Sequence, residues 1–388
     1  MEIIFLHITL GLNRIYKSFP LTKLMKIAMI APEYGSEKAI AFYSKNLVDA
    51  LKKSKISADL FTYTAGKPFS FLKILGNLKD YDIVHVQHEY NLLGNYGIPF
   101  FIVFPLIKVF KSRKAKIVTT MHTAISTKEK FLGSKIKNIL RKTLYFFQNR
   151  WINFFSEKII LHQNFFVEAL KGYGIQEKKI NIFPQGILEN IKLISKTKAK
   201  KELNLKGKVY LIIGSLHRDH GADIILNNAE KINGTILIAG NPNAVNDRNV
   251  TKMKNWLDYL KGIAKKNNSK QNIRFDLKKI PNELWWKYFS AANLILQPYR
   301  GSIGSGIFTD AMASQTPIIG SNVPFFRGIL ENYKCLMISK NDLEFPKNIK
   351  QAMISSNYKS MKEECKRYLK ENGYTPLGKR YKEFYSSI

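Results

Sequence analysis

The sequence has only two cysteines and few acidic residues, and each shortage excludes a class of protein. Cys335 and Cys365 are too few for a disulfide scaffold or a multi-cysteine metal site, and such low cysteine use is typical of a reducing cytoplasm. Against 62 Lys and Arg stand 29 Asp and Glu, which gives a formal net charge of +33. An anionic partner, such as a membrane surface, a nucleic acid or a phosphorylated substrate, would explain this excess. A compositional bias would explain it equally well.

Long apolar runs are also absent from the sequence. The longest, residues 97–107, has about half of the roughly 20 residues needed to cross a bilayer, and two prolines interrupt it. Residues 1–24 begin with an apolar stretch, but no basic segment precedes it and no clear cleavage site follows, so we do not expect a signal peptide. A buried strand first becomes recognisable after Met25. We therefore interpret residues 1–24 as an N-terminal extension.

The sequence does contain a regular alternation of short apolar runs and amphipathic stretches, which is typical of parallel βα units. A chain of 388 residues is long enough for two domains, because single cores rarely grow past about 250–300 residues. The pattern predicts strands at 27–32, 58–63, 83–86, 116–121, 158–161, 180–183, 209–214, 235–240, 272–276, 293–298 and 316–321. It predicts helices at 39–53, 165–171, 251–265, 304–314 and from about 357 onward.

A polar, lysine-rich segment at about 189–208 interrupts the alternation, and we interpret it as the connection between two doubly wound α/β halves. The predicted domains are 25–190 and 191–371, with a C-terminal helix at 372–388 that returns to the first domain. Ligands of such sheets bind at the carboxyl ends of the strands. We therefore expect the chemistry in the loops after the strands, along a cleft between the two domains.

In the first half, small or polar residues follow three of the predicted strands. The loop after residue 32 places Gly35 and Ala39 near a helix start, where backbone amides can bind an anion, although it has no G-x-G-x-x-G fingerprint. Two further strand ends deliver histidine, and this repetition favours a binding site over a purely structural role. The residues at these two strand ends are Gln87, His88, Glu89 and His122.

The second half offers two loops of the same kind. The loop after its first strand contains Ser215, Arg218 and His220, and the two basic residues could contact a diphosphate; an ordinary polar loop is the alternative. The densest signal is 297–313, where a Gly/Ser loop leads into a helix, so that free amides and the helix dipole would form a phosphate cradle. Asp310 in this helix could bind a ribose diol. The residues of the cradle are Gly304, Ser305, Gly306 and Ile307.

Taken together, these loops resemble the family 4 glycosyltransferases of the GT-B fold, over nearly the whole chain from Met25. Residues 39–41, 87–90 and 122–123 are similar to the first domain of that family, and 298–321 resembles its donor-binding stretch. Residues 182–187 resemble its crossing between domains, with Gln185 where histidine is usual. The resemblance implies two Rossmann-like domains that face a cleft, with the donor mainly on the second domain and the acceptor on the first.

The resemblance also implies an activity. It implies a retaining hexosyltransferase that moves a sugar from a nucleotide-diphosphate donor to a glycan or a lipid-linked acceptor. No metal or other cofactor is expected, because helix dipoles and basic side chains stabilise the departing diphosphate in such enzymes. In this scheme His122 contacts the sugar or phosphate and Asp310 holds the ribose. The amides of 304–307, with Arg218 or His220, bind the diphosphate.

Several positions depart from the family's pattern. The two glutamates of the family are Ser302 and Asp310 here, and its diphosphate-binding arginine and lysine are Ser215 and His220. The glycine of the first loop is Ala39. Two fixed positive charges are thus replaced by a neutral and a titratable group, for which Arg218 or Arg300 would have to compensate. A side chain at position 39 would hinder close backbone approach. The alternative function is therefore a catalytically degenerate protein that binds a glycan or a partner.

The basic residues gather in residues 101–150, which contain a single acid, Glu129. A predicted helix at 135–155 has apolar residues on one face and basic residues largely on the other, the pattern of a helix in an anionic interface, and 100–114 would add a second contact. An apolar face that simply covers a sheet is the alternative. We expect a cytoplasmic protein bound peripherally to the inner face of the cell membrane. We expect no nucleic-acid partner, because no recognised motif is present.

Overall fold

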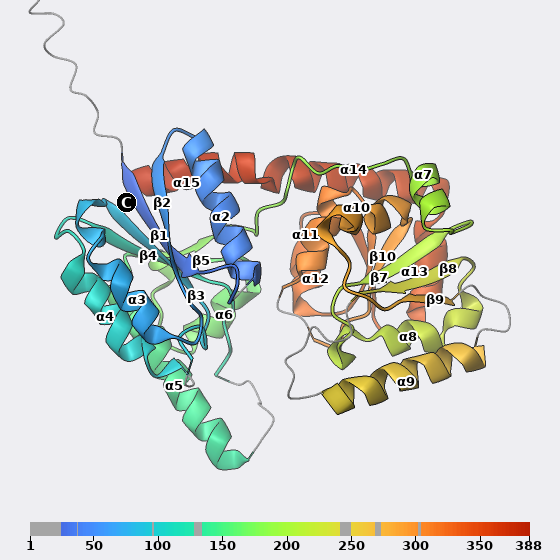
Figure 1. The fold of residues 1–388 in the computed structure, drawn as a ribbon, viewed down its shortest axis with the longest axis horizontal. Coiled ribbons are helices and arrows are strands. Elements are labelled where there is room, and N and C mark those ends of the chain that lie inside the picture. The colour runs from blue at the N-terminus through green and yellow to red at the C-terminus, as the bar shows by residue number, and fades with distance from the viewer. Residues whose placement is uncertain are drawn as a thin grey trace, which may run out of the picture.

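The computed structural model describes residues 25–36, 38–94, 97–127, 134–240, 250–267, 273–301 and 304–388. These residues form two six-stranded sheets, side by side and each flanked by helices (Figure 1). The strand orders are β2-β1-β3-β4-β5-β6 and β12-β11-β10-β7-β8-β9, and the paired strands run parallel. The predicted α/β fold with two doubly wound, Rossmann-like domains is therefore confirmed.

The strands match most of the predicted ones closely. The first sheet contains β1 (Lys26–Pro32), β2 (Ser57–Tyr63), β3 (Ile83–His88), β4 (Lys116–Met121), β5 (Lys158–Leu161) and β6 (Ile180–Ile182). The second contains β7 (Val209–Ile213), β8 (Thr235–Ala239), β9 (Ile273–Asp276), β10 (Leu294–Gln297), β11 (Ile318–Ser321) and β12 (Leu336–Ser339). Among the strands of the described ranges, only β12 lies outside the predicted ones.

The helices of the N-terminal domain are α2 (Lys38–Lys53), α3 (Pro68–Leu75), α4 (Phe100–Phe110), α5 (Lys135–Phe155) and α6 (Phe165–Lys171). Those that follow are α7 (Lys196–Glu202), α8 (Ala222–Asn227), α9 (Val250–Asn267), α10 (Asn282–Ala291), α11 (Gly306–Ala313), α12 (Pro324–Leu330), α13 (Glu344–Ala352), α14 (Ser355–Asn372) and α15 (Tyr374–Ser386). None of the helices in the described ranges is long and apolar enough to span a membrane.

Burial on both faces explains why the strands appear as continuous apolar runs. Helices cover both sides of a parallel sheet, so every position of a central strand faces a core. Every residue of β7 and of β8 is buried, as are the residues of β1 after Lys26. A helix needs only one apolar face, and α2 accordingly buries Tyr43, Leu47 and Leu51 at a spacing of four residues.

The strand order reverses at one point in each sheet, between β1 and β3 in the first and between β7 and β10 in the second. Loops that leave neighbouring strands at such a point run to opposite faces of the sheet and open a crevice between them. The loops after β1, β3, β7 and β10 all leave from these two points. The fold therefore places four of the loops singled out in the sequence where an α/β protein binds ligands. The fifth, which carries His122, follows β4, the strand next to β3.

Two crossings connect the domains, and they run side by side. The amide of Ile187 donates to Asn372 O over 3.1 Å, and the amide of Tyr374 donates to Ile187 O over 3.1 Å. Gly373 lies between the two helices, where a Cβ atom would come within 2.6 Å of the side chain of Glu189 and displace it. After this crossing α15 returns to the N-terminal domain and packs against α2, as the red and blue helices in Figure 1 show. The domain boundaries at 190 and 371 stay a prediction.

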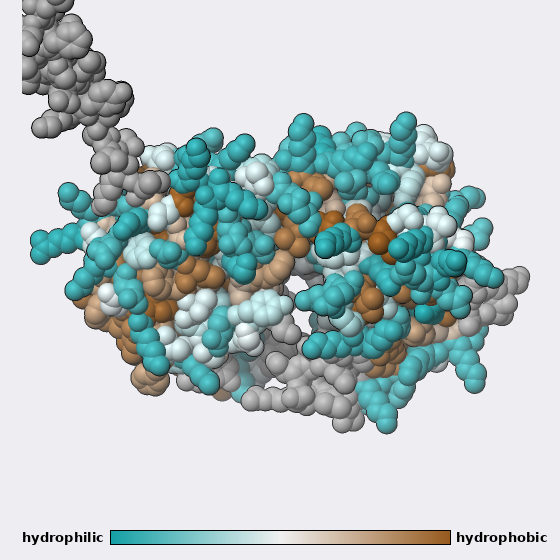
Figure 2. Space-filling view, turned by 45° about the horizontal axis from the view of Figure 1, so that its top comes forward, coloured by the Kyte–Doolittle hydropathy of each residue, from teal (hydrophilic) through white to brown (hydrophobic). Residues whose placement is uncertain are grey.

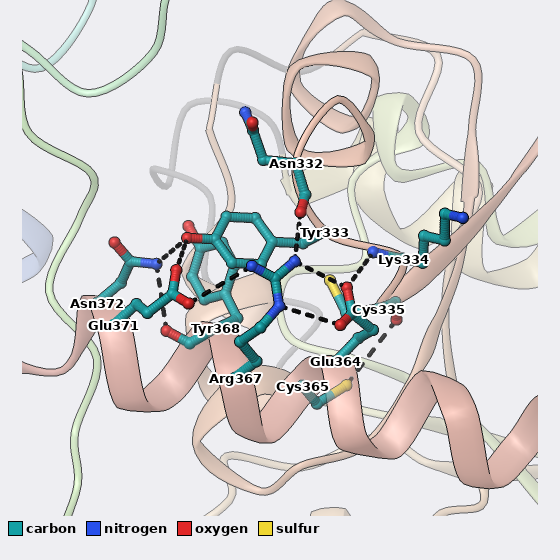
Figure 3. Close-up of polar contacts among 10 residues, drawn as sticks. All are labelled: Asn332, Tyr333, Lys334, Cys335, Glu364, Cys365, Arg367, Tyr368, Glu371 and Asn372. Atoms are coloured by element: carbon teal, nitrogen blue, oxygen red, sulfur yellow. Dashed lines mark hydrogen bonds and ion pairs between the residues drawn. The ribbon is translucent and has the colours of Figure 1, made fainter.

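A polar cluster fastens α14 to the segment before β12 (Figure 3). The guanidinium of Arg367 lies 4.4 Å from the ring centre of Tyr333 and pairs with the carboxylates of Glu364 and Glu371. The next residue of the helix, Tyr368, is buried and reaches the space between the two domains. The cluster thus fixes the helix that supplies one wall of that space.

The segment at 189–208, interpreted from the sequence as a connection, is partly integrated into the C-terminal domain. It contains α7, and Ala199 and Leu205 are buried in the same core as β7 and α10. Lys198 and Lys201 of α7 are exposed, whereas Lys196 and Lys200 are half-buried and bond to Tyr358 and Asn293. The many lysines hid the helical character of this segment.

Candidate active site between the two domains

A pocket lies between the domains, at the carboxyl ends of both sheets, and we call it the interdomain pocket. Figure 2 shows the opening between the two halves of the molecule. The pocket is lined by His122, His162, Gln163, Gln185, Gly304, Phe308, Thr309, Phe325 and Tyr368. His122 and Gly304, both predicted site residues, thus face the same space from opposite domains.

His122 directly follows β4, and both of its ring nitrogens have partners. Its Nδ1 lies 3.2 Å from Nε2 of His162, and its Nε2 lies 2.9 Å from Oε1 of Gln87. Burial and the neighbouring histidines His162 and His85 hold the pKa of His122 well below its ordinary value. His122 is therefore neutral at neutral pH and suited to hydrogen bonding with an uncharged sugar hydroxyl.

The other polar residues at the end of β3 have different environments. His88 is buried beside the rings of Tyr90 and Phe100, and its Nε2 has no hydrogen-bond partner among the described residues. Burial lowers the pKa of His88 to about 3. The carboxylate of Glu89 accepts a hydrogen bond from the hydroxyl of Thr123. Gln87 contacts His122 of the interdomain pocket through its side chain, and the carbonyl of His88 accepts from the amide of His122 over 3.1 Å.

Gly35 and Ala39 lie after β1 and are exposed, and the described part of the chain places both outside the interdomain pocket. A Cβ atom on Gly35 would meet no atom of the described residues within 4 Å. Their predicted role toward an acceptor stays a prediction.

In the C-terminal domain, the loop after β7 carries less positive charge than its residues suggest. His220 donates from Nδ1 to the carbonyl of Ser215, and its ring centre lies 5.0 Å from that of Tyr299. Burial lowers the pKa of His220, so this side chain is neutral at neutral pH. Arg218 is exposed and forms no ion pair with any described residue. It is therefore the basic group of this loop that remains available to an anion.

Arg300 joins the loops after β7 and β10. Its NH2 group lies 2.6 Å from the carboxylate of Asp223, which is buried, and its NH1 group donates to Arg218 O over 2.6 Å. Asp223 raises the pKa of Arg300, so the guanidinium remains charged. Because its charge is already paired with Asp223, Arg300 is less available to neutralise a diphosphate. Its hydrogen bond to the carbonyl of Arg218 helps to position that residue.

The start of α11 is a helix end capped by a side chain. Ser305 caps the helix, since its Oγ accepts from the amide of Phe308 over 3.1 Å and from Gln297 Nε2 over 2.9 Å. The amides of Gly306 and Ile307 precede the first helical hydrogen bonds and carry the positive end of the dipole. A Cβ atom added to Gly214 would lie 3.1 Å from the side chain of Ile307, so the helix start lies close to the loop after β7. Ser302 lies outside the described residues.

Asp310 lies in the second turn of α11, where its Oδ2 accepts the indole N–H of Trp285 over 3.0 Å. Burial raises the pKa of Asp310 to about 7, although the bond from Trp285 acts in the opposite direction. Sequence reasoning had no short motif by which to find Trp285, because it lies on an amphipathic helix. It could have found His162, which follows β5 as His122 follows β4.

Residues 194–374 match the family of Glycosyl transferases group 1. The chain is similar to the structure of sucrose-phosphate synthase from Thermosynechococcus elongatus, with a TM-score of 0.72 and 13% identity over 94% of this chain and 98% of that one. It is also similar to HepE from Anabaena in complex with UDP-glucose, with a TM-score of 0.68 and 11% identity over 94% and 100%. Identities this low establish the fold alone. No curated protein matches the sequence.

Proposed function

We propose that the protein moves a hexose from a nucleotide-diphosphate donor to an acceptor. Residues 194–374 match the group 1 glycosyl transferases, and the described part of the chain has the GT-B fold. The observation that carries this proposal is the interdomain pocket. It places neutral His122 opposite Gly304 and the start of α11, so a sugar could contact one domain while its diphosphate contacts the other. Transfer would require this meeting of donor and acceptor surfaces.

The donor side consists of Arg218, the amides of Gly306 and Ile307, and Asp310. The helix end supplies hydrogen-bond donors that need no reorganisation when charge develops on the departing diphosphate. Arg218 adds one fixed charge, where the related family carries two. Asp310 lies one turn beyond these amides and would accept hydrogen bonds from the ribose hydroxyls. HepE is described with UDP-glucose bound, and a UDP-sugar is accordingly the first donor to test.

We further propose retention at the anomeric carbon and catalysis without a metal. Both follow from the resemblance of 298–321 to the donor-binding stretch of the family 4 enzymes. The acceptor would be a glycan or a lipid-linked glycan that approaches from the N-terminal domain.

A membrane location is supported by the way in which α5 is packed. The residues of α5 that face the core are Tyr145, Gln148, Asn149 and Ile152. The apolar face predicted for membrane contact is a different one, and Ile136, Leu140 and Phe154 on it are 79%, 59% and 77% exposed. Trp151 on the same predicted face packs against the core, but the exposed positions do not serve to cover the sheet. In Figure 1 the N-terminal turns of α5 extend away from the body of the domain.

Helix α4 adds to the same surface. Ile102 and Val109 are 67% and 74% exposed, and Figure 2 shows apolar side chains gathered on this flank of the N-terminal domain. Basic residues lie beside them, among them Lys108, Lys137 and Arg141. Apolar side chains that enter the interface, with cations next to anionic headgroups, would hold the protein at the inner face of a membrane.

The weak charge below the proposed diphosphate favours a second candidate, a GT-B protein that binds a glycan or a partner without turnover. A thermal-shift screen against UDP-, GDP- and ADP-sugars tests donor binding, the first step of transfer. Stabilisation by one class of donor is expected for the transferase. If no donor stabilises the protein and no nucleotide is released, the binding function replaces it.

A further inference from the structure

Three histidines of the N-terminal domain form one continuous chain of hydrogen bonds. His85 in β3 contacts Gln87, Gln87 contacts His122, and His122 contacts His162 (3.3, 2.9 and 3.2 Å between the side-chain atoms). The chain begins at the hydroxyl of Tyr385 in α15, which contacts Nδ1 of His85, and ends at the carbonyl of Phe183, 2.9 Å from Nδ1 of His162. It therefore runs across three neighbouring strands to the crossing between the domains.

The last contact fixes the positions of the protons. A backbone carbonyl only accepts, so Nδ1 of His162 carries a hydrogen. Burial lowers the pKa of His162 to about 4, so the ring is neutral and its Nε2 must be an acceptor. The contact with His122 is then made only if Nδ1 of His122 carries its hydrogen. Because His122 is neutral as well, its Nε2 has a free lone pair.

The same reasoning orients Gln87. An acceptor nitrogen on His122 needs a donor, so the amide nitrogen of Gln87, and not its oxygen, faces His122. The two ends of an amide have nearly the same shape, and the network decides between them. Nε2 of His85 then carries a hydrogen, which it shares between the oxygen of Gln87 and the hydroxyl of Thr120, 2.7 Å away. Nδ1 of His85 accepts from Tyr385. This orientation gives up one contact of Gln87 with the sulfur of Met29, a weak acceptor.

All the bonds now point in one direction, from Tyr385 to Phe183, and bonds arranged in this way strengthen one another. The ring of Tyr43 packs edge-on against both imidazoles, 5.3 Å from His122 and 5.1 Å from His162, and limits their rotation. His162 is itself only 4% exposed. We propose that His162 is a positioning residue, which holds His122 as its Nδ1–H tautomer at the edge of the interdomain pocket.

This inference rests on the proposed function in one respect, namely that the fixed tautomer presents His122 to the donor sugar. A His122 ring in this tautomer offers a lone pair at Nε2. A sugar hydroxyl that replaces or shares the contact with Gln87 must therefore approach as a donor. His162 itself acts through His122 and is not assigned contact with the reacting atoms.

Nitrogen NMR of the full chain labelled with 15N-histidine tests the tautomer without any assay of activity. At pH 7.5 the protonated and unprotonated ring nitrogens have well-separated shifts, and the signals of His122 and His162 are assigned from their losses in H122Q and H162Q. We expect hydrogen on Nδ1 of both rings. Hydrogen on Nε2 of His122, or on both of its nitrogens, would overturn the inference, whether or not the protein transfers sugar.

Two variants test the positioning role. His162→Gln retains an acceptor near the place of Nε2, whereas His162→Phe retains the ring and removes the acceptor. We expect His162→Phe to lower kcat/KM for the donor sugar about tenfold and to mix the two tautomers of His122, with wild-type affinity for free UDP. His162→Gln should retain most of the wild-type kcat/KM. Equal losses in both variants, or none in either, would contradict the role. An inactive wild type with the expected tautomers would contradict the proposed function alone.

Discussion

The indole N–H of Trp285 donates to Oδ2 of Asp310 over 3.0 Å, and this bond joins α10 to the second turn of α11. Asp310 thereby has one oxygen committed within the C-terminal domain. The other can accept from a ligand, as the carboxylate of a ribose-binding residue must. Burial acts against the charge that this function needs, since it raises the pKa of Asp310 to about 7.

Nucleotide binding should consequently depend on pH. Ribose hydroxyls donate best to an ionised carboxylate, so the affinity for UDP should increase as the pH rises through about 7. Stability should change in the opposite sense. The raised pKa means that the folded protein holds a proton that the unfolded chain loses near pH 4, so this group's contribution to stability falls between about pH 4 and 7. Calorimetric titration with UDP at pH 6 and pH 8 measures the first effect.

The matched variants separate the charge of Asp310 from its packing. Asp310→Ala should weaken UDP binding at least tenfold, and Asp310→Asn should weaken it and remove the pH dependence. Trp285→Phe retains the aromatic packing and loses the N–H, so it should shift the pH dependence to higher values. Unchanged UDP affinity in Asp310→Ala would show that this residue does not bind the nucleotide.

Acid should destabilise the N-terminal domain through its buried histidines. Burial lowers the pKa of His85 and of His88 to about 3, so between about pH 3 and 6.5 the unfolded chain binds protons that the folded chain excludes. Stability is then lost as the pH falls, by about 1.4 kcal/mol per pH unit for each such group. His88→Leu removes one of them. Between pH 7.5 and 5 this variant should lose about 2 kcal/mol less of the free energy of unfolding than the wild type, measured with urea. An equal loss would contradict a neutral His88.

How far the sequence predicts the structure is seen in two histidines. The strand at 116–121 and the polar residue after it were enough to place His122 in the pocket, because strand ends meet at one edge of a parallel sheet. His162 follows the strand at 158–161 by the same rule, yet its contact with His122 depends on the register between β4 and β5, which no local pattern states. Trp285 is harder still, since its partner Asp310 comes from another helix.

The positive charge available in the loop after β7 could likewise be predicted only in part from the sequence. The loop after β7 has basic residues that the sequence can count, but pairing and burial decide which are available. Arg300 is paired with Asp223, and His220 is neutral in its contact with Ser215. Arg218 remains available to an anion. This result depends on the contacts between the loops after β7 and β10, which the sequence does not show.

Gly221 should be far less tolerant of a side chain than Gly207. Both have positive φ, +67° and +63°, so alanine costs about 1–2 kcal/mol of backbone strain at either position. At Gly221 the new Cβ would also lie 1.9 Å from the carbonyl oxygen of Pro298, whereas at Gly207 it would meet no described atom within 4 Å. We expect Gly221→Ala to cost about 2 kcal/mol more than Gly207→Ala in chemical unfolding. Equal costs would show that the loops after β7 and β10 are not in close contact.

Membrane binding should depend on the exposed face of α5. Replacing Ile136 and Ile139 with aspartate removes apolar contacts and adds repulsion from anionic headgroups, so flotation with phosphatidylglycerol vesicles should be lost. Leu343→Asp is a matched control, because Leu343 is 71% exposed on the C-terminal domain. It should float like the wild type. Replacing Lys137, Arg141, Lys142 and Arg150 with alanine should weaken flotation and its dependence on salt. Equal flotation of all these proteins would reject α5 as the anchor.

The most direct test of the central claim is the release of nucleoside diphosphate from purified protein incubated with UDP-, GDP- and ADP-sugars, with and without membrane lipid extract as acceptor. The account predicts that one class of donor yields nucleoside diphosphate and that Asp310→Ala abolishes most of this release. Absence of release and of nucleotide binding with every donor would contradict it. The fold would then serve recognition and not transfer.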